Sequence, residues 1–327
     1  MKNASTNSGE YLHPLQTSEG GRLSFGMRLM TGLPWKVKMS IASKPTLWRM
    51  YSGICRRVGW RSPRPGWYAS PNGPYAGILL PATCPNDLWV TSGTYEASIS
   101  TWLVRLLTDE RWGTIGRPVW DVGTHKGVIA LLCLKHGAEA VFGFEPLPQN
   151  LESARMAMSA NPALASRFHL LPFAVGDSDC ELEFQIGPSD SEGQLITSQV
   201  EPSKRSLQSP PRLSVRCVCL DDYSLAAIKP PGIIKIDIEG AEVMALTGAS
   251  ECLRKFKPLL LLEIHNVNCW SGSVSLLSHL GFSVWQIQSS NRLIKAIKPF
   301  EYGHLLAVPC DHPALEAARR CATERTN

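Results

Sequence analysis

The stretch from Val119 to Gly127 constrains the fold of this chain more than any other part of its sequence. It is a short apolar strand that ends in two spaced glycines, and a helical pattern follows directly. A second apolar strand, 140–144, is followed by an acidic residue, Glu145, twenty-two residues after Gly123. In a doubly wound α/β sheet the carboxyl ends of two such strands lie side by side, at the edge where ligands bind. The sequence therefore predicts a sheet of this class with a ligand site at that edge.

The spacing of the glycines indicates the kind of ligand. Glycines let the backbone approach a ligand closely, and an acid at the next strand end can accept both hydroxyls of a ribose. The turn carries Gly-x-x-x-Gly in place of the Gly-x-Gly-x-x-Gly that holds a pyrophosphate at a helix N-terminus. A nucleoside without phosphates fits this turn better, which points to S-adenosylmethionine. The missing fingerprint also makes a nicotinamide-dependent oxidoreductase the weaker alternative.

Strand and helix patterns alternate from Val119 to Val308, which is typical of a parallel α/β sheet. Two further alternating strands, 181–186 and 213–220, flank a Ser/Pro/Gln-rich insert at 187–212. An insert of this length is more often a substrate lid or a disordered loop than scaffold. The strands expected in the sheet are 119–122, 140–144, 168–175, 233–238, 258–264, 283–288 and 304–308.

The N-terminal part of the chain is strongly basic. No acidic residue occurs between Glu19 and Asp87, and the apolar side chains over 46–58 share one face of a helical pattern. A basic amphipathic element could lie on an anionic membrane surface or grip an acidic substrate, although a helix that packs on the catalytic domain is commoner. We expect a basic, partly disordered extension at 1–90 with one helix and a Pro/Gly linker at 62–86, a catalytic domain at 91–310 and a tail at 311–327.

The composition favours a cytoplasmic protein, with peripheral membrane contact as an option. No apolar run approaches the ~20 residues of a membrane span, and the N-terminus lacks the apolar region of a secretory signal. The ten cysteines have no regular spacing and no Cys-x-x-Cys pair, which indicates reduced thiols and disfavours zinc.

Four stretches, taken together and in this order, resemble the FkbM-type family of S-adenosylmethionine-dependent methyltransferases. The resemblance implies a class I methyltransferase fold: a Rossmann-like, mostly parallel sheet of seven strands flanked by helices, with the last strand antiparallel. It also implies O-methylation of a hydroxyl on a sugar, a glycan or glycolipid, or a secondary metabolite. The four stretches are Asp121–Gly127, Phe144–Asn150, Ile234–Glu242 and Leu262–His265.

The resemblance assigns a cofactor site to the ends of the first three strands. Asp121 would hold the methionine amino group by a charge-assisted hydrogen bond, Glu145 the ribose, and Asp177 the adenine amine. The family usually carries Ala-Asn where this chain has Thr124 and His125; His125 either binds the cofactor carboxylate or, as we favour, lies exposed on the turn. The residues expected at the cofactor are Asp121, Gly123, Thr124, Gly127, Glu145, Pro146 and Asp177.

Polar residues also follow the fourth and fifth strands, where the acceptor would meet the methyl group. A hydroxyl becomes a nucleophile as its proton leaves, and a carboxylate or a histidine is the usual base. We favour Asp237 slightly as this base, with His265 orienting the acceptor. The alternatives are His265 as the base with an ordinary pKa near 6.5, a structural ion pair of Lys235 with Glu263 or Glu239, and, second in rank, a divalent metal on these acids. The expected catalytic residues are Asp237, Glu239, Glu263 and His265.

Two other functions remain as alternatives. A non-catalytic cofactor-binding module would have little reason to carry these polar groups at the ends of buried strands. Methylation of nucleic acid or protein is a closer rival because the N-terminus is basic, but the fourth strand is followed by Asp237-Ile-Glu239 and lacks the Asn/Asp-Pro-Pro-Tyr-like loop suited to a flipped base. We therefore expect a small-molecule or glycan acceptor, with nucleic acid unfavoured.

Overall fold

The computed structural model describes most of the chain beyond residue 94 and a few segments before it. The described residues are 37, 46, 50, 66–69, 73–82, 95–186, 193–195, 212–225, 228–288 and 290–323. Most of the amphipathic helix expected near 46–58 and most of the insert at 187–212 lie outside these residues.

Within the described residues the main sheet has eight strands, in the order β13-β12-β14-β11-β10-β3-β4-β5. The five strands from β11 to β5 pair in parallel, whereas β14 pairs antiparallel with both β11 and β12. The mostly parallel sheet with an antiparallel last strand is therefore confirmed, and the short β13 adds an eighth strand at the edge. The strands are β3 (Val119–Val122), β4 (Val141–Phe144), β5 (Phe168–Leu171), β10 (Ile233–Ile236), β11 (Leu259–Ile264), β12 (Phe282–Ile287), β13 (Leu293–Lys295) and β14 (Gly303–Pro309).

The central strands are nearly continuous apolar runs because helices cover both of their faces. All four residues of β3, β4 and β10 and all six of β11 are buried. Polar side chains enter these strands at only a few positions: Asp121 in β3, Lys235 in β10 and Glu263 in β11. Polar groups need partners when they are buried, so these three residues indicate where a functional site could lie in the sheet.

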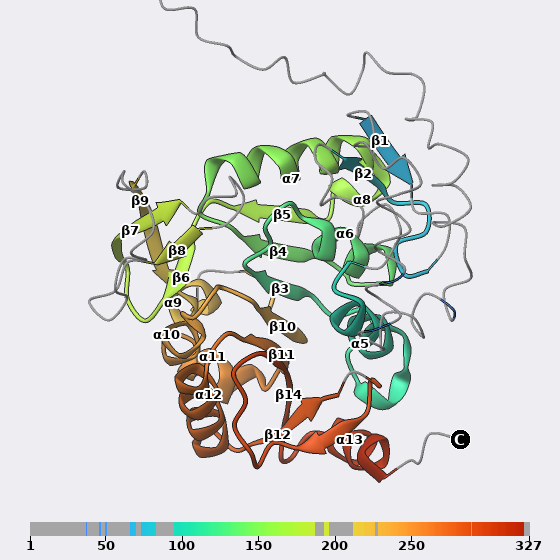
Figure 1. Cartoon of the computed structure of the whole chain (residues 1–327), viewed down its shortest axis with the longest axis vertical. Coiled ribbons are helices and arrows are strands. Elements are labelled where there is room, and N and C mark those ends of the chain that lie inside the picture. The colour runs from blue at the N-terminus through green and yellow to red at the C-terminus, as the bar shows by residue number, and fades with distance from the viewer. Residues whose placement is uncertain are drawn as a thin grey trace, which may run out of the picture.

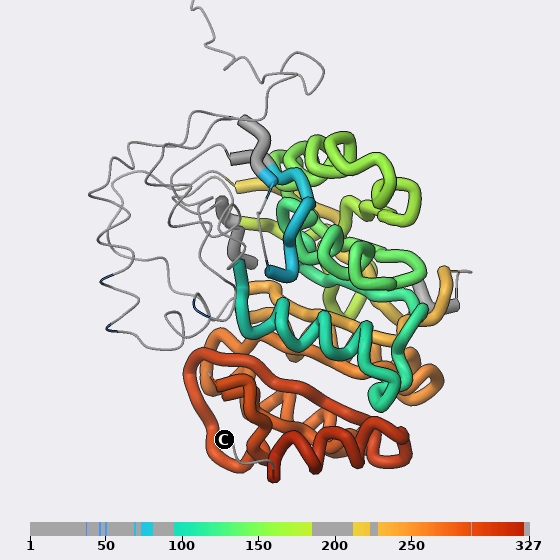
Figure 2. Tube along the Cα trace, turned by 90° about the vertical axis from the view of Figure 1, so that its right-hand side faces the viewer, coloured from blue at the N-terminus to red at the C-terminus, as the bar shows by residue number. Residues whose placement is uncertain are grey.

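Two apolar cores lie on opposite faces of the main sheet. Helices α5 (Ala97–Thr108), α6 (Val128–Lys135), α7 (Pro148–Ala160) and α13 (Ala314–Thr323) pack on one face. Figure 2 shows them one below another, from α7 in light green at the top to α13 in red at the bottom. Helices α10 (Glu242–Thr247), α11 (Ser250–Phe256) and α12 (Val267–His279) pack on the other, at the lower left of Figure 1. Three shorter helices complete the described part: η3 (Glu110–Trp112), α8 (Pro162–Ala165) and α9 (Leu220–Leu225).

A second, smaller sheet begins where the expected third strand breaks. The strand predicted over 168–175 stops at Leu171, because Pro172 has no amide hydrogen for the ladder. The chain then pairs with a different sheet of order β6-β9-β7-β8. Its strands are β6 (Ala174–Gly176), β7 (Cys180–Ile186), β8 (Gly193–Leu195) and β9 (Arg212–Cys219).

Two other boundaries differ from the sequence-based expectation, while the tail at 311–327, expected to be helical or frayed, contains a helix. The region expected as a linker at 62–86 contains an antiparallel hairpin of β1 (Gly66–Ala69) and β2 (Leu79–Ala82). The amide of Asn161 accepts from the backbone N of Leu79 at 2.9 Å and thus ties β2 to the catalytic domain. The single helix expected over 239–253 is divided into α10 and α11, and the last part of the chain packs on the domain as α13. None of the described helices is both long enough and apolar enough to cross a bilayer.

Candidate active site

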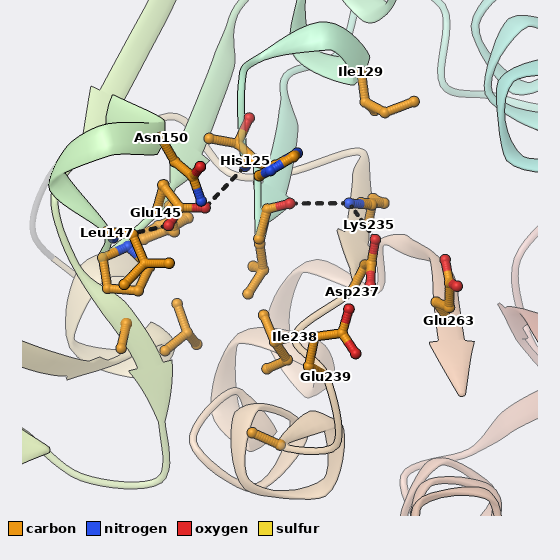
Figure 3. Close-up of a pocket in the computed structure, with 18 of the residues that line it drawn as sticks. His125, Ile129, Glu145, Leu147, Asn150, Lys235, Asp237, Ile238, Glu239 and Glu263 are labelled. Carbon is orange, nitrogen blue, oxygen red and sulfur yellow. Dashed lines mark hydrogen bonds and ion pairs between the residues drawn. The ribbon is translucent and has the colours of Figure 1, made fainter. Parts of the chain in front are cut away.

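A cavity of about 320 Å³ lies at the carboxyl ends of β3, β4 and β10. The strand order reverses between β3 and β10, and this reversal is where ligands bind in open α/β sheets. The second sheet closes one side through Leu182 and Phe184 of β7. Glu145 and Asn150 lie at one end of the close-up in Figure 3, and Lys235, Asp237 and Glu263 at the other. The cavity thus brings together residues from both predicted sites.

Glu145 is held rigidly at the end of β4. Its two carboxylate oxygens accept hydrogen bonds from the backbone N of Leu147 at 2.8 Å and of His125 at 3.0 Å. Burial raises the pKa of Glu145, and these hydrogen bonds and one from Asn150 oppose that rise. The carboxylate lines the cavity at the end of β4, the edge where the sequence analysis expected it.

The two glycines of the turn have different roles. Gly123 lines the cavity with a φ of 80°, and a Cβ there would lie 1.9 Å from the backbone oxygen of Asp237. Gly127 caps the start of α6 with a φ of 76° and lies against the ring of Phe168. Gly127 is therefore required by packing and does not line the cavity. His125, by contrast, does line it, as do Thr124 and Pro146.

Asp121 lies behind the cavity wall and does not line it. It is fully buried; its Oδ2 accepts a hydrogen bond from the Thr124 hydroxyl at 2.7 Å, and its Oδ1 lies 3.4 Å from Lys235 Nζ. The role predicted for Asp121, to hold the methionine amino group, therefore does not fit its position. Asp121 instead fixes Lys235 and the turn.

Lys235 pairs with neither of the acids that the sequence suggested. Its Nζ lies 3.2 Å from Asp237 Oδ2 and donates to the backbone oxygen of Gly123 at 3.1 Å. Burial alone would lower the pKa of Lys235, but Asp237 and Asp121 outweigh it and raise the pKa well above the usual value. The lysine is thus a permanent cation that holds Asp237 at the cavity.

His265 lies behind Asp237 and is oriented from the other side. Its Nδ1 lies 2.8 Å from Glu242, and its Nε2 lies 3.6 Å from Asp237 and 3.5 Å from Glu239. Burial would lower the pKa of His265, but these three carboxylates raise it to about 9. The pKa near 6.5 that the alternative of His265 as the base assumed is therefore wrong: with a pKa of about 9 the group is an imidazolium near neutral pH. It does not line the cavity.

Glu239 and Glu263 also differ from their expected arrangement. Strand β10 ends at Ile236 and Glu239 has a φ of 52°, so the alternation through Lys235 and Asp237 does not extend to it. Glu263 accepts hydrogen bonds from the Tyr302 hydroxyl and from His304. Burial works to raise the pKa of Glu263, but His304 and Tyr302 outweigh it and lower the pKa to about 2. Both glutamates line the cavity.

Asp177 does not reach the cavity. It is exposed at the end of β6, where its Oδ1 accepts a hydrogen bond from the Ser178 hydroxyl at 3.1 Å. Phe173, Ala174 and Val175 line the cavity from the same segment. The contact with adenine that we predicted for Asp177 is therefore not available to its side chain in this position.

Sequence reasoning missed Glu96, which precedes α5 and lines the cavity. Its carboxylate lies with those of Asp237 and Glu263, with one oxygen of each within 4.8 Å of the others. A second group of the same kind among the described residues combines Asp237, Glu239 and His265. Either group has the composition of a divalent cation site, although Lys235 and the imidazolium already supply positive charge there.

Known proteins with similar sequences are methyltransferases. The hexuronic acid methyltransferase AglP of Haloferax volcanii is 25% identical over 164 residues, which cover 50% of this chain and 61% of AglP. A probable histone-arginine methyltransferase 1.4 of Arabidopsis thaliana is 26% identical over 125 residues, 38% of this chain and 22% of that protein. The chain therefore spans less than two thirds of the length of these curated relatives.

One family model matches the chain, and a solved structure of low similarity aligns with it. The crystal structure of methyltransferase FkbM from Methylobacillus flagellatus KT aligns with a TM-score of 0.41 and 17% identity, covering 81% of this chain and 72% of that one. The model of the methyltransferase FkbM domain matches residues 121–287, about half of the sequence. The chain belongs to the FkbM methyltransferase family.

Proposed function

We propose that this protein transfers a methyl group from S-adenosylmethionine to a hydroxyl of a sugar or glycan. The observation that carries the proposal is one cavity with a fixed hydroxyl acceptor, Glu145, at one end and a cation-held carboxylate, Asp237, at the other. The donor set fits the cofactor, because Glu145 suits a ribose diol and the surplus of carboxylates suits a positively charged ligand.

S-adenosylmethionine would supply a methyl group on a positively charged sulfur. Transfer to a hydroxyl forms the O–CH₃ bond, breaks the S–CH₃ bond and releases the hydroxyl proton. Asp237 would accept that proton, since its carboxylate lines the cavity and a carboxylate within hydrogen-bond reach can act as general base. Lys235 and the His265 imidazolium keep their charge throughout and hold the two oxygens of Asp237 from behind.

A sugar acceptor is supported by the rim of the cavity and by AglP. Tyr302 is 66% exposed, and its hydroxyl donates to Glu263, so the ring offers an apolar face beside a polar edge. AglP is a hexuronic acid methyltransferase by name. We infer that the acceptor is a hydroxylated ring that lies against Tyr302 with its hydroxyl toward Asp237.

A protein arginine is the second candidate acceptor. The carboxylates of Glu96, Asp237 and Glu263 lie close together, and a guanidinium pairs readily with such groups. The relative from Arabidopsis thaliana acts on histone arginine by its name, although it shares only 125 aligned residues with this chain. A single labelling experiment separates the two acceptors.

The test is transfer of radiolabelled methyl from S-adenosylmethionine to a panel of acceptors: uronic acid-containing glycans, neutral glycans, glycolipids, arginine-rich protein and RNA. We expect label in the glycan or glycolipid samples, loss of transfer in Asp237→Asn, and normal transfer in the control Asp179→Asn, whose side chain pairs with Arg216 on the second sheet. Label in the protein or RNA alone would contradict the proposed acceptor.

We also propose that the basic extension gives the protein peripheral contact with anionic membrane surfaces. The ten Lys and Arg between Arg22 and Arg64 carry this proposal, since clustered basic residues attract anionic lipid in a salt-dependent manner. Deletion of residues 1–60 should abolish binding to phosphatidylserine vesicles at low salt and leave cofactor affinity intact. A full-length protein that does not bind such vesicles would refute it.

A further inference from the structure

The wall of the cavity carries more carboxylates than cations. Glu96, Glu145, Asp237, Glu239 and Glu263 line it, and among the described residues Lys235 is the only lysine or arginine that does. Lys235 is already shared between Asp237 and the buried Asp121. A cavity with this imbalance is suited to a ligand that brings positive charge, because an uncompensated charge is costly in a partly dehydrated site.

Among the five carboxylates that line the cavity, Glu96 is the one with a buried oxygen that the described residues leave without a hydrogen bond. Its Oε2 is buried and has no hydrogen-bond partner among the described residues. Although Glu96 is the residue before α5, its side chain makes no capping hydrogen bond to that helix, and its backbone is left-handed with a φ of 39°. The side chain lines the cavity and does not serve as a helix cap.

The surroundings of Glu96 bring its pKa close to neutral pH. Burial raises the pKa of Glu96 to about 7; the charges of Asp237 and Glu263 also raise it, while Lys235 and a hydrogen bond with Tyr95 oppose the rise. A ligand cation beside Glu96 would lower the pKa of its carboxylate. Binding of that cation should therefore be accompanied by loss of a proton from Glu96.

We propose that Glu96 binds the ammonium group of the methionine part of S-adenosylmethionine, the role that the sequence assigned to Asp121. Asp121 is not available, since it does not line the cavity: Thr124 donates to its Oδ2 behind the wall, and Lys235 Nζ lies 3.4 Å from its Oδ1. An ammonium has N–H donors for the unpaired Oε2, whereas a sulfonium has none. The inference rests on the proposed function, because it takes that cofactor as the ligand.

The test compares three ligands by titration calorimetry on wild type and Glu96→Gln. S-adenosylmethionine carries both cations, S-adenosylhomocysteine only the ammonium, and 5′-methylthioadenosine neither. We expect Glu96→Gln to bind the first two about 10- to 100-fold more weakly, as for loss of a hydrogen bond to a charged group, and to bind 5′-methylthioadenosine as wild type does. The exposed Glu110→Gln serves as the matched control and should bind all three normally.

Each other outcome overturns the inference in a recognisable way. A loss confined to S-adenosylmethionine would assign Glu96 to the sulfonium, and unchanged affinities with a fall in turnover would make it a base. Equal losses for all three ligands would indicate a general disturbance of the cavity. Wild type that binds none of them would instead refute the proposed function. For the wild type we further expect S-adenosylhomocysteine to bind more weakly as the pH falls below 7 and to release protons on binding near pH 7; neither effect should occur in Glu96→Gln.

Discussion

Lys235 and Asp121 face each other on neighbouring strands, with Nζ 3.4 Å from Oδ1 and almost no exposure of either side chain. They are register partners of the β10–β3 pair, at the point where the strand order reverses. Lys235 also contacts Asp237 at the cavity, so Asp121 fixes the ammonium group that in turn fixes Asp237. The position of Asp237 at the cavity thus depends on Lys235, and through it on Asp121, which does not line the cavity.

Removal of Lys235 should destabilise the protein strongly, because it leaves Asp121 buried without its cation. We expect Lys235→Met to lower the free energy of unfolding by about 3–5 kcal/mol. The double variant Lys235→Met/Asp121→Asn should recover most of the loss, since the fully buried carboxylate is then replaced by a neutral amide, and Asp237 retains partial exposure. Urea unfolding measures both. Equal stability of the single and double variants would contradict this role for the pair.

A methyl group at Gly123 should be far more harmful than one at Gly281, although both residues have nearly the same backbone conformation. Their φ angles are 80° and 82°, so alanine at either costs about 1–2 kcal/mol in strain. At Gly281 nothing lies within 4 Å of the new Cβ, whereas at Gly123 the backbone oxygen of Asp237 lies 1.9 Å away. We expect thermal unfolding to show about 1–3 kcal/mol of extra loss in Gly123→Ala. A similar loss of stability in the two variants would contradict the close approach of the Gly123 turn to the backbone of Asp237.

The pH dependence of turnover distinguishes an imidazolium from a base at His265. The folded-state pKa of about 9 lies above the ordinary value, so the proton stays bound through neutral pH and leaves as the pH rises through 9. At saturating cofactor we expect turnover to hold between pH 7 and 8 and to fall above about pH 9, and we expect His265→Gln to lose this alkaline limb. Turnover that instead rises about tenfold per pH unit between pH 7 and 8 would make neutral His265 the base.

The proton on His265 also disfavours a metal ion at this site. A histidine must give up its proton to bind a metal, so the imidazolium makes the group of Asp237, Glu239 and His265 a poor cation site near neutral pH. We expect turnover to be unchanged after treatment with a chelator and after addition of Mg²⁺ or Mn²⁺. Activity that is lost with the chelator and restored by either ion would establish a metal-dependent reaction.

The main sheet and Glu145 could be predicted because their signals are local. A run such as Leu259–Ile264 is apolar at nearly every position because both faces of the strand are covered, and an acid directly after an apolar strand lies at the edge of the sheet. The break of the third strand had a local signal as well, in Pro172. That its continuation pairs with β9 depends on residues about forty positions further along the chain, and no short pattern specifies such a pairing.

The roles of individual acids could not be predicted, since they depend on which side chains the fold brings together. The partner of Asp121 follows from the register of β10 against β3. The charge of His265 follows from its contact with Glu242, the first residue of helix α10. Glu96 belongs to no motif and precedes the first one by about twenty-five residues. Its only sequence signal is an acid just before an amphipathic helix, which is common in helices without any site.

Titration of the folded wild-type protein with S-adenosylmethionine tests the central claim most directly, with NAD as the competing ligand. The account predicts saturable binding of S-adenosylmethionine at one site, no measurable binding of NAD, and a loss of roughly 1.5–3 kcal/mol of binding free energy in Glu145→Ala, whose carboxylate would hold the ribose. A folded protein that binds NAD tightly and S-adenosylmethionine not at all would contradict the account.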